Sequence, residues 1–143
     1  MAFVINTKEY MEDEDRRFID QPVLRIELPK YWTVMTRIRY RTDLTKLSYG
    51  KTVTVPREFV TDLASIPRAI RSMVTKDGPN RWAAIVHDYL YSLKGKGPKG
   101  LPRKVCDDIF MEAMIDLKVP KWKRMAMYRG VRLWGWRTWN KKV

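Results

Sequence analysis

The polar side chains best suited to chemistry are concentrated in two short stretches of the chain. Residues 61–68 read Thr-Asp-Leu-Ala-Ser-Ile-Pro-Arg, and residues 87–91 read His-Asp-Tyr-Leu-Tyr. His87 is the only histidine among the 143 residues. Histidine and carboxylate side chains are common proton carriers and metal ligands in enzymes. Any functional site is therefore expected between Phe59 and Tyr91, with help from residues further along the chain.

Two catalytic arrangements would use these side chains. A divalent metal would take His87 with Asp62 and Asp107 as ligands and leave positions open for water. Alternatively, Ser65, His87 and a carboxylate would form a nucleophilic triad, although no nucleophile-elbow pattern surrounds Ser65. A single histidine excludes the His-rich zinc sites, so the metal pattern is not specific.

The same residues also have a purely structural interpretation. A lone histidine at the edge of an apolar helical stripe is often a hydrogen-bonded structural residue. Arginines paired with the aspartates would form a buried ionic network that ties a loop to two helices. Catalytic and structural interpretations share one candidate cluster: Asp62, Ser65, Arg68, His87, Asp88, Tyr91, Arg103 and Asp107.

The elements that must position this cluster change in character along the chain. Residues 1–20 form a charged N-terminal segment, and residues 21–56 show the period-2 alternation of strands, clearest from Trp32 to Tyr40. Residues 57–78 form a loop that contains the first motif, and residues 79–139 have the 3.6-residue periodicity of helices. This order predicts one α+β domain, in which an antiparallel meander of about three strands is covered by about three C-terminal helices.

The helices differ in what they offer. Helix 102–117 has an apolar stripe that includes Cys106, so this thiol is expected to be buried and structural. The last helix, 120–139, is apolar all round and strongly basic, with no acidic residue after Asp116. Because one small sheet cannot cover all of its apolar faces, we expect a partner there. The predicted partner-binding residues are Trp122, Lys123, Arg124, Arg129, Arg132, Trp134, Trp136, Arg137 and Trp139.

The charge of the chain favours polyanionic or acidic partners. The formal net charge is +13, and residues 73–143 contribute most of it, with 16 Lys and Arg against 6 Asp and Glu. The N-terminus lacks the pattern of a signal peptide, and no segment approaches the ~18 apolar residues of a membrane span. A cytoplasmic location is the default expectation.

Several of these motifs together resemble a family of short phage and prophage proteins catalogued as a domain of unknown function. The resemblance covers residues 53–139 and rests on Val55-Pro56, residues 59–68, residues 83–91, Arg103 with Asp107 and Phe110, Met127-Tyr128, residues 131–133 and Gly135. It implies a phage origin, a location in the host cytoplasm or the virion, and one compact domain. The family has no assigned activity, so the resemblance adds no chemistry.

Three functions follow as expectations. The first is a phage accessory or virion assembly protein that binds another phage protein, or itself, through the basic, Trp-rich C-terminal helix. The second is a metal-assisted hydrolase of a phosphodiester or cell-wall bond that uses Asp62, His87 and Asp107. The third is non-specific nucleic-acid binding by Lys118–Lys142.

Overall fold

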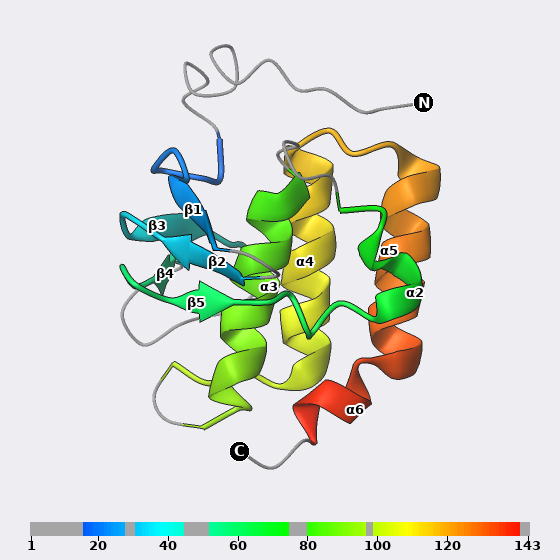
Figure 1. The fold of residues 1–143 in the computed structure, drawn as a ribbon. Helices are drawn as coiled ribbons and strands as arrows, with labels where there is room; N and C mark the ends of the chain where they lie inside the picture. Colours follow the sequence, from blue (N-terminus) through cyan, green and yellow to red (C-terminus); the bar gives the residue numbers. More distant parts are fainter. Residues whose placement is uncertain (1–15, 28–30, 45–51, 75–79, 97–98, 141–143) are drawn as a thin grey trace.

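Strands and helices occupy separate halves of the molecule in the computed structural model (Figure 1). The structure describes residues 16–27, 31–44, 52–74, 80–96 and 99–140. Short strands lie at one side, and three long helices stand beside them with their axes nearly aligned. The expected α+β fold, with N-terminal antiparallel strands followed by three main C-terminal helices, is confirmed.

The strands form two small sheets instead of a single meander. In the first sheet, β1 (Leu24–Glu27) pairs with β2 (Tyr31–Val34), and β2 pairs with β5 (Val60–Thr61). In the second sheet, β3 (Ile38–Arg41) pairs with β4 (Thr52–Val55). All pairs are antiparallel.

The strand expected from Trp32 to Tyr40 is interrupted, which corrects the sequence-based prediction. A bend at residues 35–37 separates β2 from β3 and sends them into different sheets. Val34, Ile38 and Tyr40 are nevertheless all fully buried. Alternation in sequence records which side chains face the core, and it does not require the hydrogen-bonded ladder to continue from one residue to the next.

Three 14-residue helices and two short ones make up the rest of the fold. The long helices are α3 (Asn80–Leu93), α4 (Arg103–Asp116) and α5 (Lys121–Trp134). The short ones are α2 (Arg68–Arg71), which lies against α5, and α6 (Trp136–Trp139). The helix expected over 120–139 therefore stops at Gly135 and restarts as α6. None of the helices in the described ranges is both long and apolar enough to cross a membrane.

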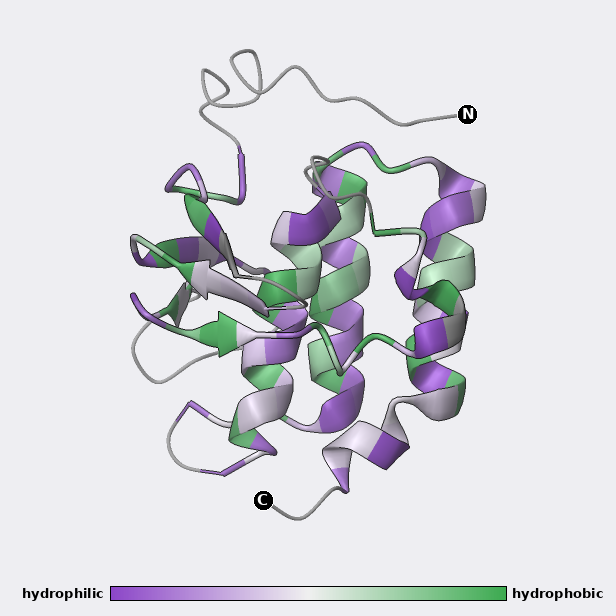
Figure 2. Ribbon diagram, viewed as in Figure 1, coloured by the Kyte–Doolittle hydropathy of each residue, from purple (hydrophilic) through white to green (hydrophobic). Residues whose placement is uncertain are grey.

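The core lies between the strands and α3 and continues between the helices. Its largest fully buried side chains include Phe18, Tyr40, Tyr91 and Phe110. Apolar and polar positions are interspersed along α3 and α4, as Figure 2 shows by colour, and the apolar side chains of Ile85, Leu90, Ile109 and Phe110 are buried. Cys106 is fully buried, as predicted, and burial raises the pKa of its thiol to about 12. Such a thiol stays protonated and acts as a small apolar residue.

Candidate functional site

Asp107 of α4 is the centre of a buried polar network. The Oδ1 atom accepts hydrogen bonds from Nε2 of His87 at 2.7 Å and from the hydroxyl of Tyr91 at 2.6 Å. The Oδ2 atom accepts from Arg132 at 2.7 Å and, more weakly, from Arg103 at 3.4 Å. Asp107 and His87 are both fully buried. Both carboxylate oxygens therefore have two donors each within the protein.

His87 connects this carboxylate to the motif loop. Its Nδ1 atom lies 3.0 Å from Oγ of Ser65. Because ionised Asp107 can only accept, Nε2 carries the proton and Nδ1 accepts the proton of the Ser65 hydroxyl. The imidazole ring is held between the rings of Tyr91 and Phe110, at centroid distances of 4.3 and 4.7 Å. The tautomer and the ring orientation are thus both fixed.

Asp88 holds the same loop from a second direction. It accepts a hydrogen bond from the Thr61 hydroxyl and another from the backbone N–H of Ser65 at 3.0 Å. Oγ1 of Thr61 in turn accepts from the backbone N–H of Leu63 at 2.9 Å. Leu63 has a left-handed backbone, with φ of 60°, which is unfavourable for a leucine. The polar contacts on both sides, and the burial of the Leu63 side chain, maintain this conformation.

Helical spacing explains why these side chains meet. His87 and Tyr91 lie one turn apart on α3, and Arg103 and Asp107 lie one turn apart on α4, so each pair shares one face of its helix. Packing of α3 against α4 then brings the two faces together. Arg103 also donates to the backbone carbonyls of Val131 at 3.1 Å and Arg132 at 3.4 Å, which attaches α5 to the network.

The network perturbs the acidity of its members. Burial raises the pKa of Asp107, but the hydrogen bonds from His87, Tyr91 and Arg132 outweigh it and leave the pKa below its ordinary value. Burial, together with the neighbouring Asp107 charge, raises the pKa of Tyr91 well above its usual value. Asp107 is therefore an ionised acceptor and Tyr91 a neutral donor at neutral pH.

The Ser65, His87 and Asp107 side chains form the triad that the sequence allowed, with the imidazole reversed. In hydrolytic triads the hydroxyl bonds Nε2 and the carboxylate bonds Nδ1, whereas here Ser65 bonds Nδ1 and Asp107 bonds Nε2. Ser65 is 1% exposed, so a substrate carbonyl has no access to its hydroxyl. The geometry of these groups, and the internal partners of their hydrogen-bonding atoms, suit a network that connects the loop to the helices better than they suit acyl transfer.

The predicted metal-ligand set of Asp62, His87 and Asp107 is not assembled. The Asp62 side chain accepts a hydrogen bond from the backbone N–H of Ala64 at 2.9 Å and so stabilises its own turn. His87 and Asp107 are bonded to each other. Within the described ranges, no three His, Cys, Asp or Glu side chains are grouped closely enough to hold a metal ion.

The structure also changes the membership of the arginine set. Arg68, predicted to pair with an aspartate, is exposed and does not reach Asp107. Arg132, predicted to bind a partner, occupies that position instead. No spacing rule could have identified Arg132, because only the packing of α5 on α4 brings it within reach of a residue 25 positions earlier.

The predicted partner-binding residues divide into exposed and internal groups. Trp122, Trp134 and Trp136 are 63%, 44% and 48% exposed, and Arg129 and Arg137 are exposed as well. Others belong to the fold, which corrects the prediction for them. Lys123 is 6% exposed, Arg124 donates to the Val119 carbonyl, Arg132 bonds Asp107, and Trp139 packs against Tyr91.

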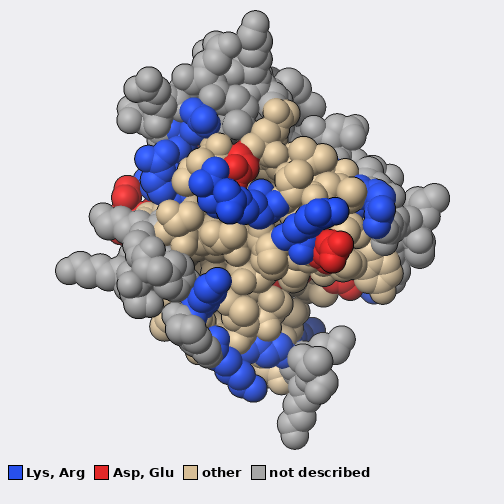
Figure 3. All heavy atoms as spheres, turned by 90° about the vertical axis from the view of Figure 1, so that its left-hand side faces the viewer, with Lys and Arg blue, Asp and Glu red and all other residues tan. Residues whose placement is uncertain are grey.

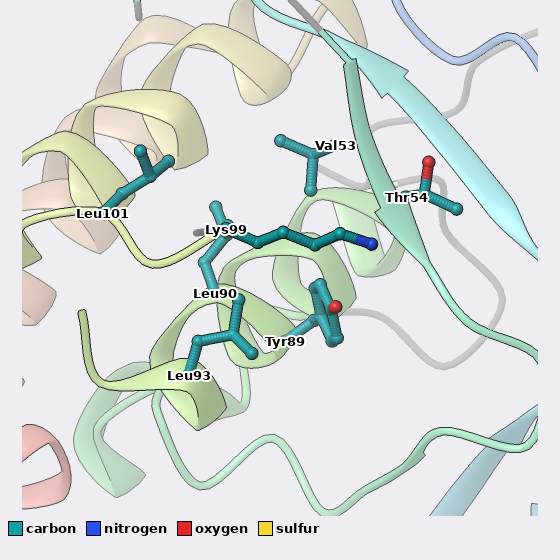
Figure 4. A pocket seen from close by; sticks show the side chains of 7 residues that line it. All are labelled: Val53, Thr54, Tyr89, Leu90, Leu93, Lys99 and Leu101. Atoms are coloured by element: carbon teal, nitrogen blue, oxygen red, sulfur yellow. The ribbon is translucent and has the colours of Figure 1, made fainter. Parts of the chain in front are cut away.

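One hollow of the described surface has no room for a ligand. It lies between β4 and α3, where the Lys99 side chain extends over Leu90 and Tyr89 toward Thr54 (Figure 4). Its volume of ≈ 10 Å³ is at the lower limit for holding one water molecule. A groove of ≈ 690 Å³ lies between α4 and α5, and a pocket of ≈ 570 Å³ lies between β2, α2 and the start of α3.

The surface charge is predominantly basic on the strand side of the molecule. Figure 3 shows several groups of Lys and Arg on this face, with few Asp and Glu among them. Exposed arginines of this region include Arg25, Arg37, Arg41 and Arg57. The sequence alone had assigned most of the positive charge to the C-terminal half. Folding thus distributes basic groups over both the strands and the helices.

Comparison with known proteins gives a family but no function. Neither the curated proteins nor the solved structures include a match to this chain. A family model described as a protein of unknown function, DUF1353, matches residues 32–131. This range runs from β2 to the last turn of α5, and it includes both motifs and the Asp107 network except Arg132. The chain therefore belongs to the DUF1353 family.

Proposed function

We propose that the protein is a phage-encoded assembly protein that acts through protein–protein contacts of its C-terminal helices. The observation that supports this function best is the apolar surface of α5 and α6. Trp122 and Leu133 are 63% and 62% exposed, and Trp134 and Trp136 add further large aromatic area. Exposed apolar groups of this size, gathered on one element, are typical of interfaces.

Three of the exposed residues of α5 share one side of the helix. Trp122, Arg129 and Leu133 are separated by seven and four residues, which places them in one line along the axis. The opposite side contains Met127, Gly130 and Val131, all buried against the rest of the fold. An aromatic anchor beside an arginine is a common composition of binding hot spots.

The groove between α4 and α5 is complementary to this surface. Apolar side chains of Met111, Ile115 and Met125 line it, with Ile115 53% exposed. Three carboxylates line it as well, from Asp108, Glu112 and Asp116, against the single guanidinium of Arg17. In a chain with a net charge of +13, such an acidic, Met-containing groove suits a basic apolar helix.

A second copy of the chain supplies such a helix. Met125 lines the groove, and Arg129 lies one turn further along α5 on the exposed side. A two-fold axis would therefore place the Trp122 surface of each copy in the groove of the other. Self-association through α5 is the proposed first step, and a phage structural protein with an acidic apolar groove would be the further partner.

Sedimentation velocity of the full chain over a range of concentrations tests this proposal. We expect a concentration-dependent dimer that Trp122→Ala and Ile115→Asp both convert to monomer. Val23→Asp, at a 48% exposed valine outside the helices, is the matched control and should leave the dimer intact. The proposal would be contradicted if the wild type stays monomeric at high concentration and a pull-down from infected cells recovers no phage structural protein.

A pair of charge-reversal variants distinguishes a specific contact from non-specific association. Arg129→Glu and Asp116→Lys should each weaken self-association, because each places like charges at the interface. An equimolar mixture of the two variants should associate again, since one altered contact is then complementary. Association of Arg129→Glu that equals the wild type would exclude this surface.

The hydrolase alternative has less geometric support than the assembly function. Its proposed ligands are Asp62, which caps a turn, and His87 with Asp107, which bond each other and further partners within the fold.

A further inference from the structure

The pocket between β2, α2 and the start of α3 has an unusual composition. Its described lining includes three arginines, Arg68, Arg71 and Arg81, with the hydroxyl of Ser72 and the apolar side chains of Trp32, Leu63 and Val74. None of these lining residues is a carboxylate. Its volume of ≈ 570 Å³ falls within the range of about 300–1,000 Å³ that is usual for small-molecule sites.

The arginines reach the pocket from rigid parts of the fold. Arg71 donates to the carbonyl of Ile66 through Nε at 3.3 Å and Nη2 at 3.1 Å, which fixes the plane of its guanidinium. The helix that bears Arg68 and Arg71 is held by Ile70, which packs closely against Gly130 of α5. The Arg71 side chain is therefore pre-positioned, which lowers the entropic cost of binding.

Arg81 and Trp32 form the opposite wall. The Arg81 guanidinium lies over the Trp32 ring, 5.3 Å from its centroid, and Arg81 is only 6% exposed. The indole N–H of Trp32 is buried and has no hydrogen-bond partner among the described residues.

We propose that this pocket binds a phosphate group of a nucleotide or of a nucleic-acid strand. The exposed Arg68 guanidinium matches phosphate oxygens in bidentate geometry, and the charges of Arg71 and Arg81 help to neutralise the phosphate. The exposed Ser72 hydroxyl is a neutral donor for a remaining oxygen. Arg68 closes the 61–68 motif, so this assignment also gives a role to the motif residue that the Asp107 network does not use.

Calorimetric titration with pyrophosphate tests the site on the full-length protein. We expect saturable binding by the wild type. Arg68→Ala should lower the affinity about 10-fold or more, the usual effect of losing a charge-assisted hydrogen bond of 1.5–3 kcal/mol. Arg68 is exposed, so this variant should unfold at the wild-type urea concentration. Arg68→Lys should restore part of the affinity.

The matched control is Arg57→Ala, an exposed arginine outside the pocket. It changes the net charge by the same amount, so it reports the effect of the general positive field. If Arg57→Ala binds pyrophosphate with an affinity within twofold of the wild type, the pocket is supported. Equal losses of affinity in Arg57→Ala and Arg68→Ala would overturn the proposal. So would the absence of binding by the wild type at about 10 mM pyrophosphate, because any Kd would then be weaker than the usual range of specific sites.

Two further probes identify the source of the phosphate. Adenosine triphosphate represents free nucleotides, and a fluorescein-labelled 12-nucleotide oligothymidine represents nucleic acid. Tighter binding of the oligonucleotide, lost in Arg68→Ala, assigns the pocket to a strand backbone, and tighter binding of the triphosphate assigns it to nucleotides. The Trp122→Ala variant should bind all three probes as the wild type does, because its surface lies on α5.

Discussion

Side chains of types that are common in catalytic sites surround the carboxylate of Asp107, and here they can stabilise the fold. A fully buried carboxylate is costly unless donors replace its water. His87, Tyr91, Arg103 and Arg132 supply those donors from three helices. The same atoms that a hydrolase would keep open are thus occupied by internal partners. We infer that the network fixes how α3, α4 and α5 dock.

Removal of the Asp107 charge should therefore lower stability strongly. Asp107→Asn leaves two partly buried arginines without their counter-ion, at an expected cost of about 2–4 kcal/mol in the free energy of unfolding. Urea denaturation followed by circular dichroism measures the change. Tyr91→Phe removes one bond to the same carboxylate and should cost about 1–2 kcal/mol.

Tyr128→Phe is the matched control for the tyrosine variant. Its hydroxyl donates to Asp108 at 2.6 Å, the same distance as in the Tyr91 bond, but the Asp108 side chain is 29% exposed. Water can replace this hydrogen bond, so Tyr128→Phe should lower the free energy of unfolding by less than about 1 kcal/mol. Equal losses for the two phenylalanine variants would show that burial of the network contributes nothing.

Acid should destabilise the protein through the same carboxylate. The folded state holds the pKa of Asp107 below its ordinary value, so ionised Asp107 stabilises the fold at neutral pH. This contribution is complete above the unfolded pKa of about 4 and is lost as the pH falls through the lower folded value. Urea titrations between neutral pH and pH 3 should show this loss in the wild type and a shallower one in Asp107→Asn. Parallel pH profiles would contradict the assignment.

Two glycines, one within α5 and one at its C-terminal end, lie in close contact with other elements. A methyl group added at Gly130 would come within 2.4 Å of Cδ1 of Ile70, so the glycine permits α2 to pack directly on α5. A methyl group at Gly135 would come within 2.6 Å of the Tyr91 hydroxyl. Both glycines thus allow close approach, at positions where helix propensity alone would favour alanine.

Gly130→Ala tests this packing. The substitution should destabilise the protein by about 1–3 kcal/mol despite the better helix propensity of alanine, because the added methyl displaces Ile70. The double variant Gly130→Ala with Ile70→Val should recover part of the loss, which a double-mutant cycle in urea quantifies. Additive effects of the two substitutions would mean that the residues do not compete for the same space.

The molecule as a whole combines a strong positive charge with one acidic groove. Three carboxylates line the groove between α4 and α5, whereas basic groups are prominent on the strand side (Figure 3). Contacts of a basic helix with that groove have an electrostatic component that salt screens. The proposed dimer therefore depends on apolar area for affinity and on charge for orientation.

Ionic strength should consequently weaken self-association. Raising the salt concentration from about 0.05 to about 0.5 M shortens the Debye length from roughly 14 to 4 Å and should shift the dimer toward monomer. Sedimentation equilibrium at both concentrations measures the shift. An increase in association with salt would indicate a purely apolar interface, and Arg129→Glu should then behave as the wild type.

The sequence by itself determined the fold class, the order of strands before helices and the burial of Cys106. These properties follow from periodicity, which is local in the chain. It also placed His87, Tyr91, Arg103 and Asp107 in one candidate cluster, to which the structure adds Arg132. Alternation could not reveal the bend between β2 and β3, because both strands turn the same side to the core.

Only the tertiary structure decided what the polar residues do. The docking of α5 brought Arg132 to Asp107, and the docking of α2 left Arg68 at a pocket. These are contacts between residues far apart in sequence, which no local pattern specifies. Saturation of a buried carboxylate is likewise a property of all the surrounding elements together. The internal partners of His87 and Asp107 therefore favour a structural role for residues whose types had suggested chemistry.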